Sequence, residues 1–163
     1  MKPFRARGDE LVARLDGAEA GVLGLLLDQL EQLLDADDVS EDPVLQRLFP
    51  EGHRGNAELA ADYRDLTEES LRSAKAEDLA TVRATLPPSG GDVRLDPDQA
   101  EAWLRSTNDL RLALGVRLDI TEDTEPPDDP VGEEGQQLAV YYWLTAVQGS
   151  LVDALVDGRA GRR

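Results

Sequence analysis

The side chains in this sequence that could do chemistry are mainly carboxylates, of which there are 34 among 163 residues. A pair of carboxylates can act as general acid and base in glycoside-type hydrolysis, and a group of them can hold a divalent cation. However, 34 acids make some close pair inevitable, and none follows a spaced ligand pattern such as a calcium-binding loop. We therefore interpret the acids as a solvated surface and expect neither a metal nor another cofactor.

The sequence has one histidine and no cysteine, and this limits the other kinds of site. Without cysteine these residues cannot form a disulfide, a thiolate metal site or a thiol redox switch. His53 lies in a glycine-flanked turn, where we expect a surface residue. The glycine-rich, serine and histidine motifs of nucleotide-binding proteins, hydrolases and metalloproteases are also missing from the sequence. We therefore expect a protein that is not an enzyme.

Residues 106–120, STNDLRLALGVRLDI, hold the most distinctive charged side chains. On a helix, the apolar residues here and just before form two opposite faces, one with Trp103, Thr107, Leu110, Leu114 and Leu118 and the other with Leu112 and Val116. The helix is therefore expected to be packed on two sides.

Arg111 and Arg117 lie between these two faces, where their aliphatic stems can run along an apolar interface. We expect them to pair with acids of a helix at 57–86, which offers Asp62, Asp65, Glu68 and Glu69. Such pairs would fix the register of two helices. Asn108 and Asp109, together with Arg111, are the members of this stretch that could bind a partner instead.

Three adjacent aromatic residues, Tyr141, Tyr142 and Trp143, cover most of a helical turn. They cannot all face one core, so at least one is exposed, hydrogen-bonded at its polar end, or in an interface, where Tyr and Trp are enriched. We therefore add them to Asn108, Asp109 and Arg111 as candidate partner-binding residues.

The net charge of −17 argues against direct nucleic-acid binding by an isolated monomer, because affinity for nucleic acid rests largely on Lys and Arg. Four cations do gather near the N-terminus, at Lys2, Arg5, Arg7 and Arg14. We interpret them as the solvated face of a β-hairpin. The N-terminus has no apolar signal region, and the longest aliphatic run, Val22 to Leu27, is too short to span a bilayer. We expect a soluble, cytoplasmic protein without membrane contact.

Apolar spacing and capping residues predict the elements that position these side chains. A β-hairpin at 4–15 turns at Gly8-Asp9, and five helices follow at about 17–35, 43–49, 57–86, 97–118 and 136–157. Three helix starts carry a signal: Asp16 with Glu19 forms a capping box, Asp42 precedes Pro43, and Asp96 precedes Pro97.

Several details of this arrangement can also be predicted. Leucines in two registers indicate that the helix at 17–35 is buried on most sides and lies at the centre. Thr67 could cap a new helix within 57–86, and residues 93–95 could add a strand to the hairpin. Residues 119–135 hold eight acids and three prolines, which is typical of a mobile acidic loop. We expect one mostly α domain over 1–163, an orthogonal bundle of about five helices with a small N-terminal β-hairpin.

Three blocks of the sequence together resemble a known family: DPVLQRLFPEGHRGNAELAADYRDLTEESLRSAK, AWLRSTNDLRLALGVRL and VYYWLTAVQGSLV. They are similar to an actinobacterial domain of unknown function whose members are described as AosR-like oxidative-stress transcriptional regulators. The resemblance runs over nearly the whole chain. It implies an α-helical scaffold, oxidation sensing through cysteines and action with a sigma factor, but no catalytic residue. Because this chain has no cysteine, disulfide sensing does not carry over to it.

The sequence thus favours a cytoplasmic, non-enzymatic regulatory protein that acts through protein contacts, and the resemblance points to transcription machinery as its partner. Two alternatives stay open. One is a homodimer that uses the same surfaces, and the other is an enzyme dependent on a metal or small molecule that uses surface carboxylates and Arg111.

Overall fold

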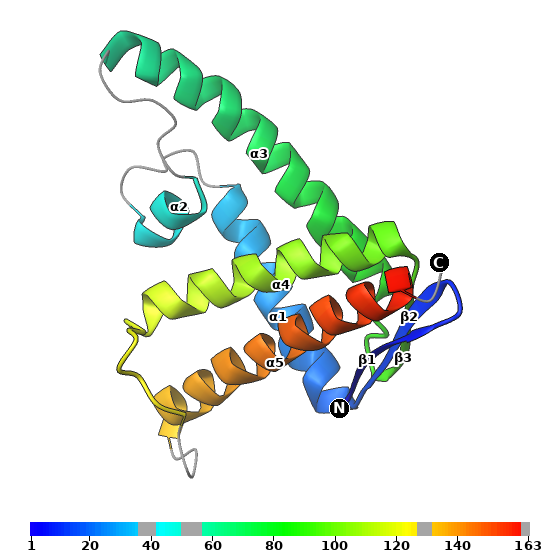
Figure 1. The fold of residues 1–163 in the computed structure, drawn as a ribbon. Coiled ribbons are helices and arrows are strands. Elements are labelled where there is room, and N and C mark those ends of the chain that lie inside the picture. The colour runs from blue at the N-terminus through cyan, green and yellow to red at the C-terminus, as the bar shows by residue number, and fades with distance from the viewer. Residues whose placement is uncertain (36–41, 50–56, 127–131, 161–163) are drawn as a thin grey trace.

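The computed structural model describes residues 1–35, 42–49, 57–126 and 132–160, with side chains outside 57–67 and 160 (Figure 1). Within these ranges the fold is mostly α and forms a single domain, with five helices and an N-terminal hairpin, as predicted. The elements in chain order are β1 (Lys2–Arg7), β2 (Glu10–Leu15), α1 (Gly17–Leu34), α2 (Pro43–Leu48), α3 (Ala57–Thr85), β3 (Gly91–Leu95), α4 (Pro97–Arg117) and α5 (Gly132–Ala160). No helix in the described part of the chain is both long and apolar enough to cross a membrane.

Helix starts follow the capping residues in the sequence. The backbone N–H of Glu19 donates to Asp16 Oδ1 at 2.8 Å, and the Glu19 carboxylate accepts from the Asp16 N–H at 2.9 Å, which is the predicted capping box. Asp96 caps α4 in the same reciprocal way, with Gln99 as its partner. These caps satisfy backbone donors that a helix start otherwise leaves unpaired.

The sheet has three antiparallel strands in the order β1-β2-β3, so residues 91–95 do add a strand to the hairpin. A close approach at Gly90 makes this possible. Gly90 has φ +91°, and a Cβ there would lie 2.8 Å from the carbonyl carbon of Asp16 and from the nitrogen of Gly17. Only glycine fits both this conformation and this space, where the turn before β3 meets the junction between β2 and α1.

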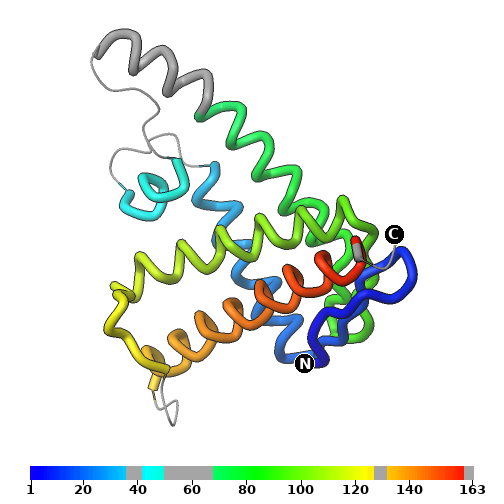
Figure 2. The backbone as a smooth tube through the Cα atoms, in the orientation of Figure 1, coloured from blue at the N-terminus to red at the C-terminus, as the bar shows by residue number. Residues whose placement is uncertain are grey.

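The central helix is α4, not α1 as the leucine pattern predicted. It contacts α1, α2, α3, α5 and the sheet, and Figure 2 shows α4 and α5 side by side with the sheet at one end of the pair. Small residues on α4, such as Ala100, Ala102 and Ala113, are buried and allow neighbours to approach. By contrast, Leu25 on α1 is 58% exposed, so that helix is covered on fewer sides than expected.

The β1 strand is fastened to the helices through two contacts. The ring of Phe4 packs edge-on against the ring of Trp103 on α4, with 5.6 Å between centroids. The Phe4 backbone N–H also donates to Ser150 Oγ on α5 at 3.3 Å. The inner face of the sheet is therefore closed by helices, and its outer face is left to solvent.

Two predicted boundaries differ from the structure. Helix α5 begins at Gly132 rather than 136, so it takes up the end of the segment predicted as an acidic loop. That segment is also anchored where it is described, because Tyr142 Oη donates to the Thr124 carbonyl at 2.9 Å. Helix α3 continues through Thr67 without a new start there.

Candidate functional site

Asp109, one of the predicted partner-binding residues, is buried in an ion pair inside the chain. Its carboxylate accepts from Lys75 Nζ on α3 at 2.9 and 3.0 Å, and the residue is 8% exposed. Burial raises the pKa of Asp109 above its ordinary value, while the hydrogen bond and the charge of Lys75 act in the opposite direction. The pair joins α3 to α4 inside the chain.

Asn108 and Arg111 face α5 and are also bonded within the chain. Gln148 Nε2 donates to Asn108 Oδ1 at 3.2 Å, and Arg111 Nε donates to Thr145 Oγ1 at 2.8 Å. The Arg111 guanidinium also lies 5.3 Å from the centroid of the Tyr141 ring. Both residues therefore bind α4 to α5.

The predicted pairing of Arg111 and Arg117 with acids of α3 is not what the described side chains show. Arg111 turns to α5, and Arg117 Nη1 donates to Gln29 Oε1 on α1 at 3.3 Å. The side of α4 that faces α3 instead carries Asp109 and Arg105, and Arg105 forms a two-pronged bond with Asp78 at 2.8 and 3.0 Å. The expected partners Asp62 and Asp65 lie outside the part of the chain whose side chains are described. His53 lies outside the described residues altogether.

All three aromatic residues of α5 are half-buried. The rings of Tyr141 and Tyr142 meet edge to face with 5.3 Å between centroids, and the Tyr142 hydroxyl bonds the Thr124 carbonyl. Trp143 Nε1 is buried without a hydrogen-bond partner among the described residues. Sequence analysis expected at least one of these residues to be exposed, hydrogen-bonded at its polar end or in an interface, and Tyr142 is hydrogen-bonded at its polar end.

The groove between α3 and α4 has a volume of about 410 Å³ and is lined partly by Lys75, Asp78, Arg105, Asn108 and Asp109. Four of its charged groups form the two ion pairs described above, and Glu77 adds one more acid to the lining. Among residues 1–35, 42–49, 57–126 and 132–160, no cluster of three His, Asp or Glu side chains could hold a metal ion. The ion pairs in the groove therefore link α3 to α4.

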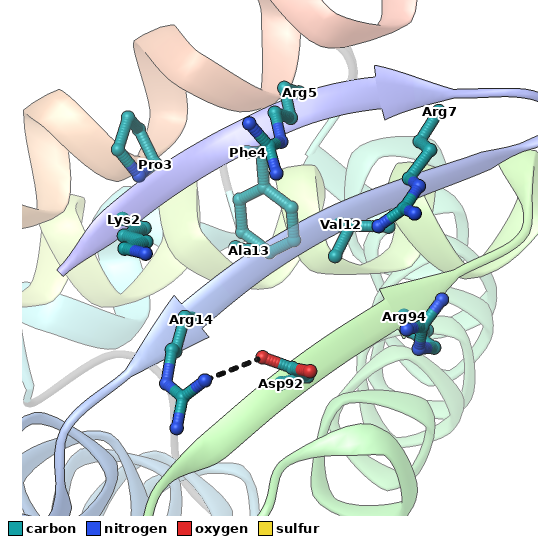
Figure 3. Close-up of a pocket in the computed structure, with 10 residues that line it drawn as sticks. All are labelled: Lys2, Pro3, Phe4, Arg5, Arg7, Val12, Ala13, Arg14, Asp92 and Arg94. Atoms are coloured by element: carbon teal, nitrogen blue, oxygen red, sulfur yellow. Dashed lines mark ion pairs between the residues drawn. The ribbon is translucent and has the colours of Figure 1, made fainter.

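The outer face of the sheet has a different character, because cations gather there (Figure 3). A hollow of about 430 Å³ lies over all three strands, and its lining includes five cations: Lys2, Arg5, Arg7, Arg14 and Arg94. We call these five residues and the two acids among them, Glu10 and Asp92, the basic face. It holds three more positive than negative charges in a chain whose net charge is −17.

The register of the sheet explains how these side chains reach one face. Directly opposite residues of neighbouring strands share a face, and Arg5 lies opposite Val12, which lies opposite Arg94. The arginines therefore flank Val12, which is only 8% exposed. We infer that their aliphatic stems cover it while their charged ends stay in water.

An irregularity in β1 adds Lys2 to the basic face. Lys2 and Arg5 are three residues apart and would project to opposite faces of a regular strand. The register shifts between them, as in a β-bulge, so Lys2 lies opposite Arg14 and Arg5 opposite Val12. Sequence analysis grouped Lys2, Arg5, Arg7 and Arg14 near the N-terminus but missed Arg94. The signal for Arg94 was the alternation of Val93 and Leu95 in a strand that pairs with β2.

Comparison with known proteins gives one family and several relatives. The family model described as "Domain of unknown function (DUF2017)" matches residues 1–155. The protein named "Oxidative stress regulator AosR" of Mycobacterium tuberculosis is 31% identical, over 91% of this chain and 78% of its own length. The "Putative oxidative stress regulator AosR" of Mycobacterium leprae is 34% identical, over 89% of this chain and 78% of its own length. No solved structure matches.

Proposed function

The chain belongs to the DUF2017 family, and from this premise we propose that it is a regulatory protein of the oxidative-stress response that acts by binding another protein. The observation that carries the proposal is the identity of 31–34% with proteins named as oxidative stress regulators, over about nine-tenths of the chain. The matched residues 1–155 include the hairpin and most of α5, which runs from Gly132 to Ala160.

The described geometry supports a binding role. Lys75, Asp109 and Arg111 on α3 and α4 are used in links between helices, whereas the cations of the basic face surround a hollow on the outer face of the sheet. A shallow hollow rimmed by long charged side chains suits contact with another macromolecule. The net charge of −17 favours a protein partner over direct promoter DNA. We therefore propose a transcriptional regulator that works in the cytoplasm with a component of the transcription machinery, such as a sigma factor.

The absence of cysteine limits how these residues can take part in an oxidative-stress response. The 163 residues contain none, so a thiol switch does not lie within them. Any oxidation of a cysteine in this response would therefore take place outside these residues, and we propose that they support the response through their contacts with a partner.

The proposal is tested by deleting the gene in its native host and challenging the cells with peroxide. We expect the deletion to lower the induction of a set of peroxide-responsive transcripts, and expression of this chain from a plasmid to restore it. Transcript levels and survival identical to those of the parent strain would overturn the proposal. Sedimentation velocity at several protein concentrations separates the homodimer alternative from a monomer that awaits a partner.

A further inference from the structure

The basic face is notable because three of its five cations have no ion-pair partner among the described residues, although the chain is rich in acids. There are 34 acids for 17 cations, so a counter-charge is easy to supply. Arg14 and Arg94 pair with Asp92 and Glu10 at 3.7 and 3.4 Å. Lys2, Arg5 and Arg7 form no ion pair with any described residue. Lys2 even lies directly opposite another cation, Arg14, an arrangement that destabilises a sheet.

The spacing of the unpaired arginines matches that of an extended polypeptide. Arg5 and Arg7 are two residues apart on one strand, so their Cα atoms are about 6.7 Å apart. Alternate side chains of a bound peptide in extended conformation have the same spacing. A guanidinium binds a carboxylate through two parallel hydrogen bonds, so each arginine can take one acidic side chain.

The two acids within the basic face favour a polypeptide over nucleic acid as the partner that binds there. Glu10 and Asp92 have side chains that are 51% and 48% exposed, and they interrupt the rows of cations. A duplex carries one charge about every 1.7 Å along its axis, so its phosphates would meet these acids and then the acidic remainder of the chain. A polypeptide can place its own uncharged or basic residues opposite Glu10 and Asp92.

From these observations we propose that the basic face binds an acidic, extended segment of a partner protein, with Arg5 and Arg7 each holding one carboxylate. This inference rests on the proposed function as a protein-binding regulator and names the surface and the chemistry of the partner. Arg94, together with the stem of Arg5, forms the walls of the hollow over Val12. Contact there would bury aliphatic surface as well as charge.

The test measures binding of a fluorescein-labelled peptide of five Glu-Ser repeats by fluorescence anisotropy at low salt. A peptide of five Gln-Ser repeats is the uncharged control. Two variants of the full chain are compared with the parent: Arg5→Glu/Arg7→Glu, and Arg47→Glu/Arg117→Glu as a matched control. Arg47 and Arg117 are exposed arginines of α2 and α4, away from the sheet. Each variant replaces two arginines by two glutamates, so both change the net charge equally.

We expect the parent to bind the Glu-Ser peptide more tightly than the Gln-Ser peptide, with affinity that falls as salt rises. Arg5→Glu/Arg7→Glu should weaken binding at least tenfold and the control variant less than threefold. Equal weakening in both variants would overturn the proposal, because only net charge would then matter. Circular dichroism checks folding, and if charge reversal prevents folding, Arg5→Gln/Arg7→Gln is compared with Arg47→Gln/Arg117→Gln instead.

Two further outcomes would assign the basic face to another partner. Tighter binding of a labelled 12-base-pair duplex than of the peptide, lost in Arg5→Glu/Arg7→Glu, would make it a nucleic-acid site. Self-association in sedimentation that this variant abolishes would make the occupant a second copy of the chain. Either result overturns the proposed partner while leaving the regulatory function intact, since that function is judged separately by the peroxide response of the deletion strain.

Discussion

Replacing Lys75 by Met tests whether the ion pair with Asp109 holds α3 against α4. The Lys75 and Asp109 side chains are 16% and 11% exposed, and two hydrogen bonds of 2.9 and 3.0 Å join them. Removing one partner from a buried ion pair costs about 3–5 kcal/mol, because the other charge stays buried and unpaired. Since some exposure remains, we expect a loss near the lower end, about 3 kcal/mol, in guanidinium unfolding at pH 7.

The pH dependence of this loss identifies Asp109 as its cause. Burial already raises the folded-state pKa of Asp109, so the folded protein binds a proton there more readily than the unfolded chain. Such a group lowers stability as pH rises from the unfolded pKa through the folded pKa. Lys75→Met removes the neighbour that counteracts the rise, so the pKa of Asp109 increases further. The difference between variant and parent should therefore be largest at pH 7 and shrink as the pH is lowered and Asp109 takes up a proton.

Two control variants make the result specific. Lys75→Met/Asp109→Leu leaves no unpaired charge and should recover most of the stability, to within about 1 kcal/mol of the parent. Arg94→Met, which breaks the exposed pair with Glu10, should cost less than about 1 kcal/mol. A loss below 1 kcal/mol for Lys75→Met at pH 7, or a loss that stays constant down to pH 4, would refute the reasoning.

Four further predictions concern the scaffold and the redox behaviour. Leu114→Ala should cost about 2–5 kcal/mol in guanidinium unfolding, because Leu114 is 7% exposed in the core. Thr85→Val should cost about 1–3 kcal/mol by the same measurement, since Trp103 Nε1 would lose its 2.7 Å hydrogen bond to Thr85 Oγ1. Gly90→Ala should cost more than Gly8→Ala, which has a positive φ but nothing within 4 Å of an added Cβ; equal thermal shifts would contradict this. Because the chain has no cysteine, peroxide treatment should leave its mobility on non-reducing gels and its peptide affinity unchanged, and a peroxide-dependent shift in either would contradict this.

The elements could be predicted from the sequence because their signals are local. Asp16, Asp42 and Asp96 each cap a helix through side-chain bonds within three residues, so spacing alone reveals them. The identity of the central helix is not a local property. Leucines in several registers pointed to α1, but the helix surrounded by others is α4, whose small buried residues give a weaker hydrophobic pattern.

Bonds from Arg111 and Arg117 on α4 to neighbouring helices could be predicted, but their partners could not, because these are neutral Thr145 and Gln29 rather than acids. The positions of Arg111 and Arg117 between two apolar faces correctly indicated that they bond neighbouring helices. Which helix each one meets depends on the rotation of α4 within the bundle. A turn of one residue position is about 100°, enough to exchange α3 for α5 as the neighbour of Arg111. The buried partner of Asp109, Lys75, is 34 residues away and leaves no local signal.

Several cations of this protein form ion pairs that link its helices, whereas three cations of the basic face form none with a described residue. Arg83 on α3 bonds Asp28 and Glu31 on α1 at 2.8 and 3.1 Å, and Arg105 and Lys75 link α3 to α4 in the same way. In a chain with twice as many acids as bases, such pairing is the expected state of a cation. On the outer face of the sheet, however, Lys2, Arg5 and Arg7 form no ion pair with a described residue, so their charge does not hold described parts of the scaffold together. This surface depends on a bulge in β1 and on the pairing of β3 with β2, which local sequence patterns do not reveal. The four cations near the N-terminus were therefore interpreted as an ordinary solvated hairpin. The partner of an acidic regulator should therefore be sought by its negative charge, despite the net charge of −17.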